Sequence, residues 1–377
     1  MSRRSGISMF NDNKLKLGVF AANCSGAMAV TKVPERWDAS WQHNRECAVM
    51  ADQAGIEFML PIARWIGYGG DTKFHGSTLE TMAWASGLLA ATQRITVFAT
   101  AHTAFTHPIV AAKQFSTMDH IGNGRFGLNV VCGWNKPEYD MFGIQLPEQH
   151  TDRYAYGQEW LDVIRKIWGS DAPFDWDGNH FRLKNVYGDP KPVNGSAPPT
   201  MNAGSSAEGR DFAARNADFL FTVMIDPEQG EKDVNEIRRN ARKRYDRDID
   251  VFTTSYIVCR PTTKEAEDYH AYYSEKYADW PAVDRLMELQ GLHAKSFPPE
   301  AFKLFRGRFA AGHGIYPLVG DPDHVANELE RISKAGFAGT TVSFVNYLDE
   351  MPYFRDEVLP RLEAKGLRKK ARPTSEQ

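Results

Sequence analysis

The chain has 377 residues, 42% hydrophobic and 25% charged, a composition typical of a globular protein with one large or two medium domains. The formal net charge is −3, and the basic run Arg368-Lys369-Lys370 is too short to predict a nucleic-acid partner. No segment is apolar over the roughly 18 residues of a membrane span, and residues 1–13 lack the apolar core of a signal peptide. The four cysteines form no CxxC pair, which favours reduced thiols and a cytoplasmic location.

Short segments of β-forming and small apolar residues recur along the whole chain. Most are near-continuous rather than alternating in hydrophobicity, as in strands that are buried on both faces. The expected strands are Lys14–Ala21, Glu57–Ala63, Ile95–Ala101, Phe126–Gly133, Pro199–Gly204, Asp218–Val223, Asp250–Cys259 and Gly339–Val345.

Segments with helical periodicity lie between these strands. They are Trp41–Gln53, Thr78–Ala91, Pro108–Ile121, Arg153–Trp168, Ser205–Asn216, Pro227–Tyr245 and Asp323–Ala335. A capping box from Ser77 to Glu80 predicts the start of the second helix. Asp321-Pro322 predicts the start of the last helix, and Gly336 predicts its end.

The alternation of strands and helices predicts a parallel sheet with crossover helices. Eight such units at this length most simply close into an α/β fold of the (β/α)8 TIM-barrel type. The alternative is an open doubly wound sheet. Its phosphate fingerprint, GxGxxG after the first strand, is missing from Ala21–Gly26, so the barrel is favoured.

Two segments exceed what a minimal barrel needs, and they predict insertions after strands 4 and 7. They are Phe174–Pro198 and Thr262–Val319. Insertions that follow barrel strands often cover the active-site mouth. We find no internal repeat and predict a single domain over 1–377, with a frayed N-terminus (about 1–13) and a solvated C-terminal tail (about 367–377).

Functional groups of a barrel gather at the carboxyl ends of its strands. Here these ends hold Arg64, Trp65, the segment Thr100–His107, Asn129, Cys132, Trp134, Ser205 and Ser206. The chain has neither the GxSxG of a nucleophile elbow nor an HExxH zinc motif. His102 and His107 lie five residues apart across a loop, which is weak spacing for metal ligands, so we expect no metal site.

The segment Ala203–Ser206 leaves a strand and enters a helix. Backbone N–H groups and two hydroxyls meet there at the positive end of a helix, which predicts an anion site. The alternative is a simple N-cap serine. In the segment Asp119–Phe126, a helix end, a tight turn and a strand start account for the glycines by turn geometry.

The run Met118–Trp134 resembles the central signature of the bacterial luciferase-like flavin monooxygenases. The resemblance extends from about Leu15 to Leu362 and is supported by further motifs in the same order. These are Lys136–Tyr139, Gly143, Asp152–Tyr154, Ala203–Ser206 and Gly320–Ala326.

Two branches of this family are the most similar. Gly67–Phe74 and Trp134–Tyr139 resemble the pyrimidine-oxidising branch, whereas Asn23–Gly26 and Val358–Pro360 resemble the dimethyl sulfone-oxidising branch. The resemblance implies a two-component monooxygenase that uses FMNH2 and O2 to oxidise a small nitrogen heterocycle, cyclic amide or organosulfur compound. Alternatives are a deazaflavin-dependent oxidoreductase of the same fold and a non-catalytic flavin-binding barrel.

No nicotinamide fingerprint is found in the chain. We therefore expect reduced FMN to be supplied by a separate NAD(P)H:flavin reductase. The family resemblance further implies a homodimer or homotetramer.

The resemblance also assigns roles to individual residues. The implied flavin contacts are Ala63, Arg64, Asn129, Glu138, Arg153, Tyr154, Ser205 and Ser206. The implied catalytic pocket, which holds O2 for an oxygen adduct at flavin N5, consists of Leu60, Thr100, Asn129 and Trp134. The pyrimidine-oxidising branch has a threonine at the position of Cys132, whose thiol is a weaker hydrogen-bond donor.

A substrate pocket of this kind must exclude water from the reacting oxygen. We expect the aromatic side chains of Trp65, Tyr68, Phe74, Phe105 and Trp134 to form its dry wall, with core packing as the alternative role. The remaining expected pocket residues are His102 and His107, as general acids, and Cys132. Arg64 is expected to bind either an anionic substrate group or the flavin.

Overall fold

A computed structural model describes residues 6–195, 197–292 and 299–370. Residues 1–5 of the predicted frayed N-terminus (about 1–13) and residues 371–377 of the predicted C-terminal tail (about 367–377) lie outside the described residues. Within the described part of the chain, no helix is both long and apolar enough to cross a lipid bilayer.

The predicted (β/α)8 barrel is confirmed. Its strands follow one another in the order β1, β2, β3, β4, β7, β8, β9 and β11, and the sheet closes because β9 pairs with both β11 and β8. Their bounds are Lys16–Phe20, Phe58–Leu60, Thr96–His102, Phe126–Val131, Thr200–Asn202, Phe219–Phe221, Asp250–Cys259 and Gly339–Ser343. Each strand lies largely within one of the eight segments that the sequence predicted.

The chain divides into two compact units. Unit 1 comprises Met1–Asn11, Thr81–Thr222 and Glu236–Asp250. Unit 2 comprises Asp12–Glu80, Val223–Asn235 and Val251–Gln377.

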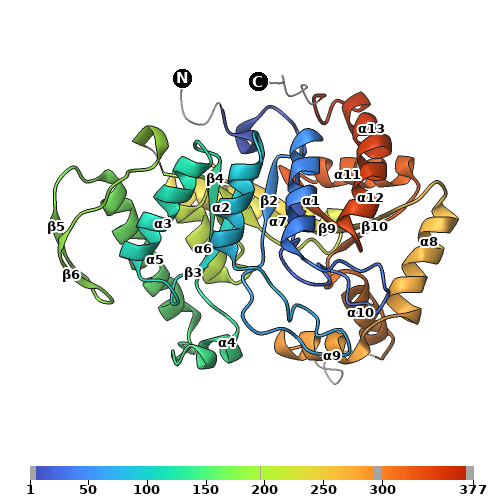
Figure 1. Cartoon of the computed structure of the whole chain (residues 1–377), viewed down its shortest axis with the longest axis horizontal. Coiled ribbons are helices and arrows are strands. Elements are labelled where there is room, and N and C mark those ends of the chain that lie inside the picture. Colours follow the sequence, from blue (N-terminus) through green and yellow to red (C-terminus); the bar gives the residue numbers. More distant parts are fainter. Residues whose placement is uncertain (1–5, 196, 293–298, 371–377) are drawn as a thin grey trace. The chain divides into compact units, whose positions relative to one another are not determined.

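Unit 1 contains the strands β3, β4, β7 and β8 and the helices that follow them (Figure 1). Its helical elements are the 3-10 turn Ser8–Phe10, α2 (Thr81–Ala91), α3 (Pro108–Ile121), α4 (Lys136–Met141), α5 (His150–Gly169), the 3-10 turn Val193–Gly195, α6 (Ala207–Asn216) and the second half of α7 (Pro227–Tyr245). Buried aromatic rings hold strands and helices together: Phe115 of α3 packs 5.7 Å from Phe126 and 6.0 Å from Trp160.

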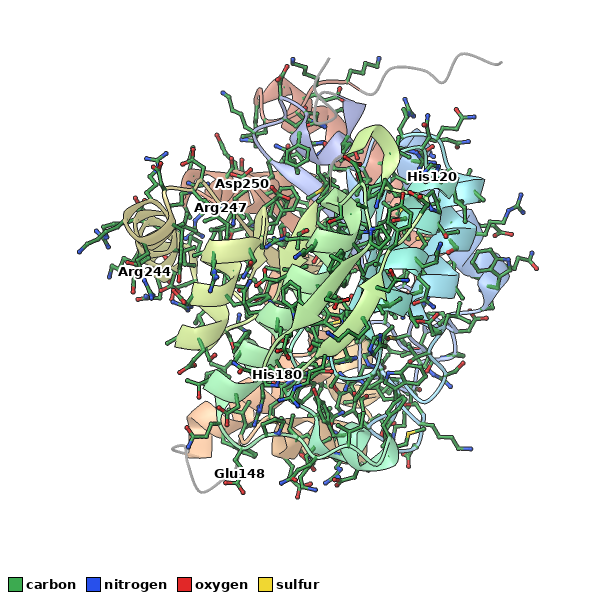
Figure 2. All side chains as sticks on the ribbon, turned by 90° about the vertical axis from the view of Figure 1, so that its left-hand side faces the viewer. His120, Glu148, His180, Arg244, Arg247 and Asp250 are labelled. Carbon is green, nitrogen blue, oxygen red and sulfur yellow. The ribbon has the colours of Figure 1, made fainter. Side chains whose placement is uncertain are left out.

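The predicted insertion before the fifth barrel strand contains a β-hairpin, β5 (Phe174–Asp177) and β6 (Arg182–Val186). The carboxylate of Glu159 on α5 holds the hairpin tip by accepting hydrogen bonds from the backbone N–H groups of His180 and Phe181 (2.9 and 3.0 Å). Figure 2 shows His180 and Glu148 toward one end of this unit and His120, near the end of α3, toward the other.

Unit 2 contains β1, β2, β9 and β11 and most of the second insertion. Its helices are α1 (Trp41–Gln53), α8 (Thr263–Ala271), α9 (Trp280–Leu289), α10 (Pro299–Gly312), α11 (Pro322–Lys334), α12 (Tyr347–Tyr353) and α13 (Leu359–Ala364), with π-helical turns at Tyr272–Lys276 and Phe354–Val358. An additional strand, β10 (Tyr316–Gly320), pairs with β9. This strand lies at the end of the predicted insertion Thr262–Val319, where no strand was expected, because a strand of five residues gives only a weak periodic signal.

The start of α2 was predicted incorrectly. Residues Ser77–Glu80 do not form a capping box, and the helix begins at Thr81. The Thr78 hydroxyl instead donates a hydrogen bond to the backbone carbonyl of His75 (3.0 Å). The Ser77 backbone N–H, which a capping box would bond to the Glu80 side chain, donates to the Ser25 hydroxyl at 3.3 Å.

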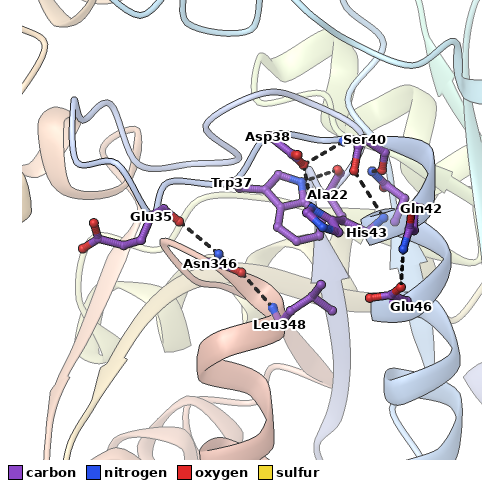
Figure 3. A network of polar contacts seen from close by, with 11 residues as sticks. Ala22, Glu35, Trp37, Asp38, Ser40, Gln42, His43, Glu46, Asn346 and Leu348 are labelled. Carbon is purple, nitrogen blue, oxygen red and sulfur yellow. Dashed lines mark hydrogen bonds and ion pairs between the residues drawn. The ribbon is translucent and has the colours of Figure 1, made fainter.

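The long loop between β1 and α1 is fixed by side-chain hydrogen bonds within unit 2. Figure 3 shows the Trp37 indole N–H donating to the Ala22 carbonyl (2.6 Å) and the Asn346 amide donating to the Glu35 carbonyl (3.0 Å). The indole is buried and meets the Tyr347 ring edge-on at 4.9 Å. These contacts give a long loop without regular secondary structure a defined path.

The prediction of a solvated C-terminal tail is wrong for Arg368. Its side chain is 4% exposed and pairs with the fully buried Glu57 carboxylate at 2.6 Å. Its guanidinium also donates to the backbone carbonyls of Leu15 (3.1 Å) and Gly55 (2.7 Å). The C-terminal segment is therefore anchored in unit 2 at least as far as Arg368.

Candidate active site

Asn129 and Thr100 form a polar pair in the interior of unit 1. They lie opposite each other on β4 and β3, and the Asn129 amide donates to the Thr100 hydroxyl at 3.1 Å. Both side chains are buried, and Oδ1 of Asn129 has no hydrogen-bond partner among the described residues. A buried amide oxygen without a donor is costly, so this position suits a ligand that offers an N–H group.

The turn after β4 depends on glycine. Gly133 has a φ of +108°, and a Cβ at this position would collide with the hydroxyl of Tyr139. That hydroxyl donates to the backbone carbonyl of Cys132 (3.2 Å) and ties the turn to α4. Glu138, a predicted flavin contact, is buried in the same helix.

The Cys132 thiol is buried in unit 1 and lies against α5. A Cβ added to Gly157 of that helix would come within 2.5 Å of its sulfur. Burial raises the pKa of Cys132 to about 12, so the group is a neutral thiol at physiological pH. It therefore offers a weak S–H donor rather than a nucleophilic thiolate.

We expect iodoacetamide at pH 8 to leave all four cysteines of the folded protein unmodified, because the reagent requires exposed thiolates. All four thiols are buried, and burial raises the pKa of Cys24, Cys132 and Cys259 to about 12 and that of Cys47 well above its usual range. Mass spectrometry of the native and urea-unfolded protein measures the labelling. Rapid modification of native Cys132 would show that its thiol is accessible.

The end of β7 and the start of α6 form a narrow cradle. The Asn202 side chain accepts from the Gly204 backbone N–H (3.0 Å), and the Ser206 hydroxyl accepts from that of Gly209 (3.1 Å). A Cβ on Gly204 would approach the Tyr154 hydroxyl and Gly209 Cα to 2.6 Å. Only glycine leaves this space open, and Tyr154 closes one of its sides.

Ser206 is the N-cap of α6, so the alternative interpretation of this segment, an N-cap serine, is observed. The anion site remains a prediction compatible with it, because a hydroxyl that accepts one hydrogen bond can still donate its hydrogen. Burial raises the pKa of Tyr154 to about 12, which keeps its hydroxyl a donor. Ser205 is exposed at the start of the same turn.

Arg153, a predicted flavin contact, braces the loop before α5. Its guanidinium donates to the backbone carbonyls of Pro147 (2.5 Å), Glu148 (3.0 Å) and Gly133 (3.5 Å). This bracing connects the turn after β4 to the start of α5. A direct contact of Arg153 with a cofactor remains a prediction.

The two predicted general acids occupy different environments in unit 1. The exposed His107 is the N-cap of α3, where its Nδ1 accepts from the Ile109 backbone N–H at 3.3 Å. His102 is buried, with its ring 4.9 Å from Phe105. Phe105 in turn stacks on Phe142 at 4.2 Å. Within the described residues, no group of three or more histidine, cysteine, aspartate or glutamate side chains is arranged to hold a metal ion.

In unit 2, the predicted site residues follow β2. Leu60 is buried at the end of the strand, and Ala63 and Arg64 are half-buried. The Arg64 guanidinium lies 4.9 Å from the centre of the Tyr68 ring, which packs 5.9 Å from Phe74. These residues form an aromatic and cationic group at the carboxyl end of β2.

The five predicted wall residues differ in exposure. Tyr68 and Phe74 are buried and Phe105 is half-buried, whereas Trp65 and Trp134 are 43% and 41% exposed. The two tryptophans therefore do not exclude water by themselves, and their role in a substrate pocket remains a prediction.

Sequence reasoning missed two histidines of unit 2 that pack around Tyr68 and Phe74. His75 directly follows the Gly67–Phe74 motif, so its position was a signal that could have been used. His313 lies far away in the chain, and no local pattern distinguishes it. The ring centres of the two histidines are 5.8 Å apart.

The closed barrel, with polar side chains at the carboxyl ends of its strands, is typical of enzymes. Comparison with known proteins identifies the class as flavin-dependent monooxygenase. The chain belongs to the luciferase-like monooxygenase family, whose model matches residues 15–339.

Curated relatives match almost the full length of the chain. The pyrimidine monooxygenase RutA of Acinetobacter baylyi is 27% identical over 356 residues, which cover 93% of this chain and 95% of the relative. The FMNH2-dependent dimethylsulfone monooxygenase of Pseudomonas fluorescens is 29% identical over 361 residues, covering 93% of this chain and 96% of the relative. Both names correspond to the two family branches that the motifs resemble.

Solved structures share the fold. DmoA from Hyphomicrobium sulfonivorans matches with a TM-score of 0.84 and 20% identity, covering 96% of this chain and 90% of its own. The long-chain alkane monooxygenase LadA matches with a TM-score of 0.83 and 21% identity, covering 95% and 93%.

Proposed function

We propose that the chain is the oxygenase component of a two-component system. It takes up reduced FMN from a separate NAD(P)H:flavin reductase and uses O2 to oxygenate a small nitrogen heterocycle, cyclic amide or organosulfur compound. The observation that carries this proposal is the buried Asn129–Thr100 pair, in which one amide oxygen has no partner among the described residues. The same unit contains the Gly204–Ser206 cradle.

The residues of unit 1 fit a flavin. Bound reduced FMN supplies the electrons that activate O2. Oδ1 of Asn129 would accept a hydrogen bond from an N–H of the flavin ring, and the bond to Thr100 keeps the amide in this orientation. A group held in this way needs no reorganisation when charge develops on the ring.

The cradle fits the phosphate end of FMN. Backbone N–H groups at the start of α6, the Ser206 hydroxyl and the Tyr154 hydroxyl are donors at one end of a helix, where an anion is favoured. No acidic side chain other than Glu208 lies in the first turn of α6.

The names of the relatives support the proposed cofactor and substrate classes. One relative is named as FMNH2-dependent, and the two names cover a pyrimidine and a sulfone as substrates. We extend the use of reduced FMN and these two substrate classes to this chain, together with assembly as a homodimer or homotetramer.

The proposal is tested by adding NADH, FMN, a flavin reductase and 18O2 to the purified chain with uracil or dimethyl sulfone. We expect mass spectrometry to detect a product that carries one 18O atom and depends on both the chain and the reductase. A reaction without the chain gives the background from free reduced flavin. If the chain instead oxidises its substrates without incorporating 18O, it is not a monooxygenase.

Tyr154→Phe is expected to raise the Kd for reduced FMN about tenfold, because it removes one hydrogen bond to a charged phosphate. Anaerobic titration followed by flavin absorbance measures the Kd. Tyr156→Phe is the matched control: its ring packs on His180 and Phe181 of the hairpin, 5.2 Å from each. Equal affinity of the two variants would argue against the cradle as the phosphate site.

A further inference from the structure

The segment Gly67–Gly76, which follows β2 in unit 2, folds into a tight loop. The backbone N–H of Tyr68 donates to the carbonyl of Phe74, and that of Phe74 donates to the carbonyl of Gly69, both at 2.8 Å. Gly69 and Gly70 turn the chain between them with a φ of +73°. Hydrogen bonds within the loop therefore define its backbone conformation.

Asp279 pins the tip of this loop from the second insertion. Its buried carboxylate accepts from the backbone N–H groups of Asp71 (3.1 Å) and Thr72 (2.7 Å) and from the Thr72 hydroxyl (2.7 Å). Next to the pinned tip, His75 adopts a φ of +55°, which is unfavourable for a residue other than glycine. Strain of this kind persists where the surrounding structure enforces it and is concentrated at functional positions.

His75 is enclosed by aromatic rings. The residue is only 1% exposed. The ring centres of Phe74, Tyr68 and His313 lie 4.0, 5.6 and 5.8 Å from the centre of the His75 ring. These four residues, with Arg64 over the Tyr68 ring, are called the histidine cluster. The cluster begins at the carboxyl end of β2, where the predicted flavin and substrate contacts of unit 2 also lie.

The hydrogen bond of His75 fixes its tautomer. Nε2 lies 2.5 Å from the backbone carbonyl of Ala27, and a carbonyl only accepts, so Nε2 carries the hydrogen. Burial is the largest cause that holds the pKa of His75 well below its usual range, and the nearby His313 and Arg64 lower this pKa further. The ring is therefore neutral, and Nδ1 presents a lone pair that accepts hydrogen bonds.

Neither Nδ1 of His75 nor Nδ1 of His313 has a hydrogen-bond partner among the described residues. Burial and Arg64 lower the pKa of His313 to about 3, so both imidazoles are neutral. His313 is half-buried, although its Nδ1 atom is buried. The cluster thus combines an unused acceptor, a second neutral imidazole and aromatic surfaces.

The positive charge of Arg64 restricts which hydrogen-bond donors can bind to Nδ1 of His75. A cationic amine is disfavoured beside a guanidinium that already suppresses the protonation of both histidines. Among the proposed substrate classes, nitrogen heterocycles and cyclic amides are the ones that offer a neutral N–H donor. Aromatic rings around it favour a flat ligand, since stacking requires a planar partner.

We propose that His75 is a specificity-determining residue, whose Nδ1 accepts a hydrogen bond from the N–H of a planar, neutral cyclic amide substrate. This inference rests on the proposed monooxygenase function and chooses between its two substrate classes. A sulfone has oxygen acceptors but no N–H, and it leaves Nδ1 of His75 without a partner. His313, whose tautomer no backbone bond fixes, is free to donate to the neighbouring carbonyl of the amide.

Matched pairs of compounds test the inference. Uracil is compared with 1,3-dimethyluracil, and 2-pyridone with N-methyl-2-pyridone, with dimethyl sulfone as a fifth probe. We expect kcat/KM for 18O incorporation to be at least tenfold higher for the N–H member of a pair. Equal or faster oxidation of the N-methyl compounds or of the sulfone would overturn the inference and leave the proposed monooxygenase function intact.

A second readout does not depend on turnover. The protein with 15N-labelled histidine is titrated with the same five compounds, and the Nδ1 resonance of His75 is assigned by its loss in His75→Asn. We expect this resonance to shift with the N–H compounds and to remain unchanged with their N-methyl partners. No shift with either N–H compound would show that these compounds do not bond to Nδ1 of His75, and it would overturn the inference.

Variants separate recognition from folding. His75→Phe keeps a ring but removes the acceptor, and we expect it to abolish the preference for N–H compounds. His75→Asn retains an acceptor and tolerates a positive φ, so it should keep most of that preference. His270→Phe is the matched control, because this half-buried histidine of unit 2 has its own partner, the Tyr256 hydroxyl at 3.0 Å.

The combined results distinguish the two proposals. A selective NMR shift without any oxygenated product supports recognition by His75 and contradicts the monooxygenase function. Oxygenation without N–H selectivity and without a shift supports the function and contradicts the role of His75. A preference for N–H compounds that persists in His75→Phe also overturns the assignment of this preference to His75.

Discussion

Asn129→Leu is expected to lower substrate oxidation by about 100-fold or more, the size of effect seen when a preorganised polar group is removed from an active site. Leucine has nearly the shape of asparagine but neither its amide N–H nor its oxygen. The change removes the hydrogen bond to Thr100 and the buried acceptor that we assign to the flavin ring. Product formation in the reductase-coupled assay and the Kd for reduced FMN are the measurements.

A folding control accompanies this variant. Asn44 is also a buried asparagine, and its amide donates to the Ser40 carbonyl (2.9 Å) in the first turn of α1. We expect Asn44→Leu to lower stability but to leave the Kd for FMN unchanged. Circular dichroism should show native helix content in both variants. Wild-type turnover in folded Asn129→Leu would refute the assigned role of this amide.

Arg368→Met is expected to lower the free energy of unfolding by about 3–5 kcal/mol, because it leaves the Glu57 carboxylate buried without its cationic partner. Glu57 is fully buried, and the Leu17 backbone N–H (2.8 Å) and the Asn13 amide (2.6 Å) are neutral donors that do not replace the lost positive charge. Urea denaturation followed by circular dichroism measures the loss.

Two further variants isolate the ion pair. Glu57→Leu combined with Arg368→Met removes both charges, and we expect the double variant to recover part of the stability that Arg368→Met loses. Lys369→Met is the neighbouring control, since its ion pair with Asp12 is 73% and 81% exposed. It should change stability by less than about 1 kcal/mol. Equal losses of unfolding free energy in Lys369→Met and Arg368→Met would mean that the buried ion pair contributes no more to stability than the exposed one.

The sequence was sufficient to predict the barrel and much of its composition. Strands buried on both faces leave continuous apolar segments, and helices leave a period of 3.6 residues, so both can be read locally. Asn129, in the carboxyl half of β4, and the turn at Gly204, after β7, could be singled out because a barrel places its chemistry toward the carboxyl ends of its strands. Their flavin roles came from the family resemblance. The short edge strand β10 was missed because its alternation covers only five residues.

Only the tertiary structure decided which polar side chains are buried and with which partners. The sequence places Arg368 among the charges of a C-terminal tail, whereas in the folded chain it pairs with Glu57, 311 residues away. Ser77 matches a helix cap by spacing, yet its backbone N–H bonds to the Ser25 hydroxyl in the loop after β1. The histidine cluster likewise joins the loop after β2 to a residue of the second insertion. Periodicity records which face of an element is apolar, whereas the partner of a buried polar group depends on contacts between distant segments, and these leave no local pattern.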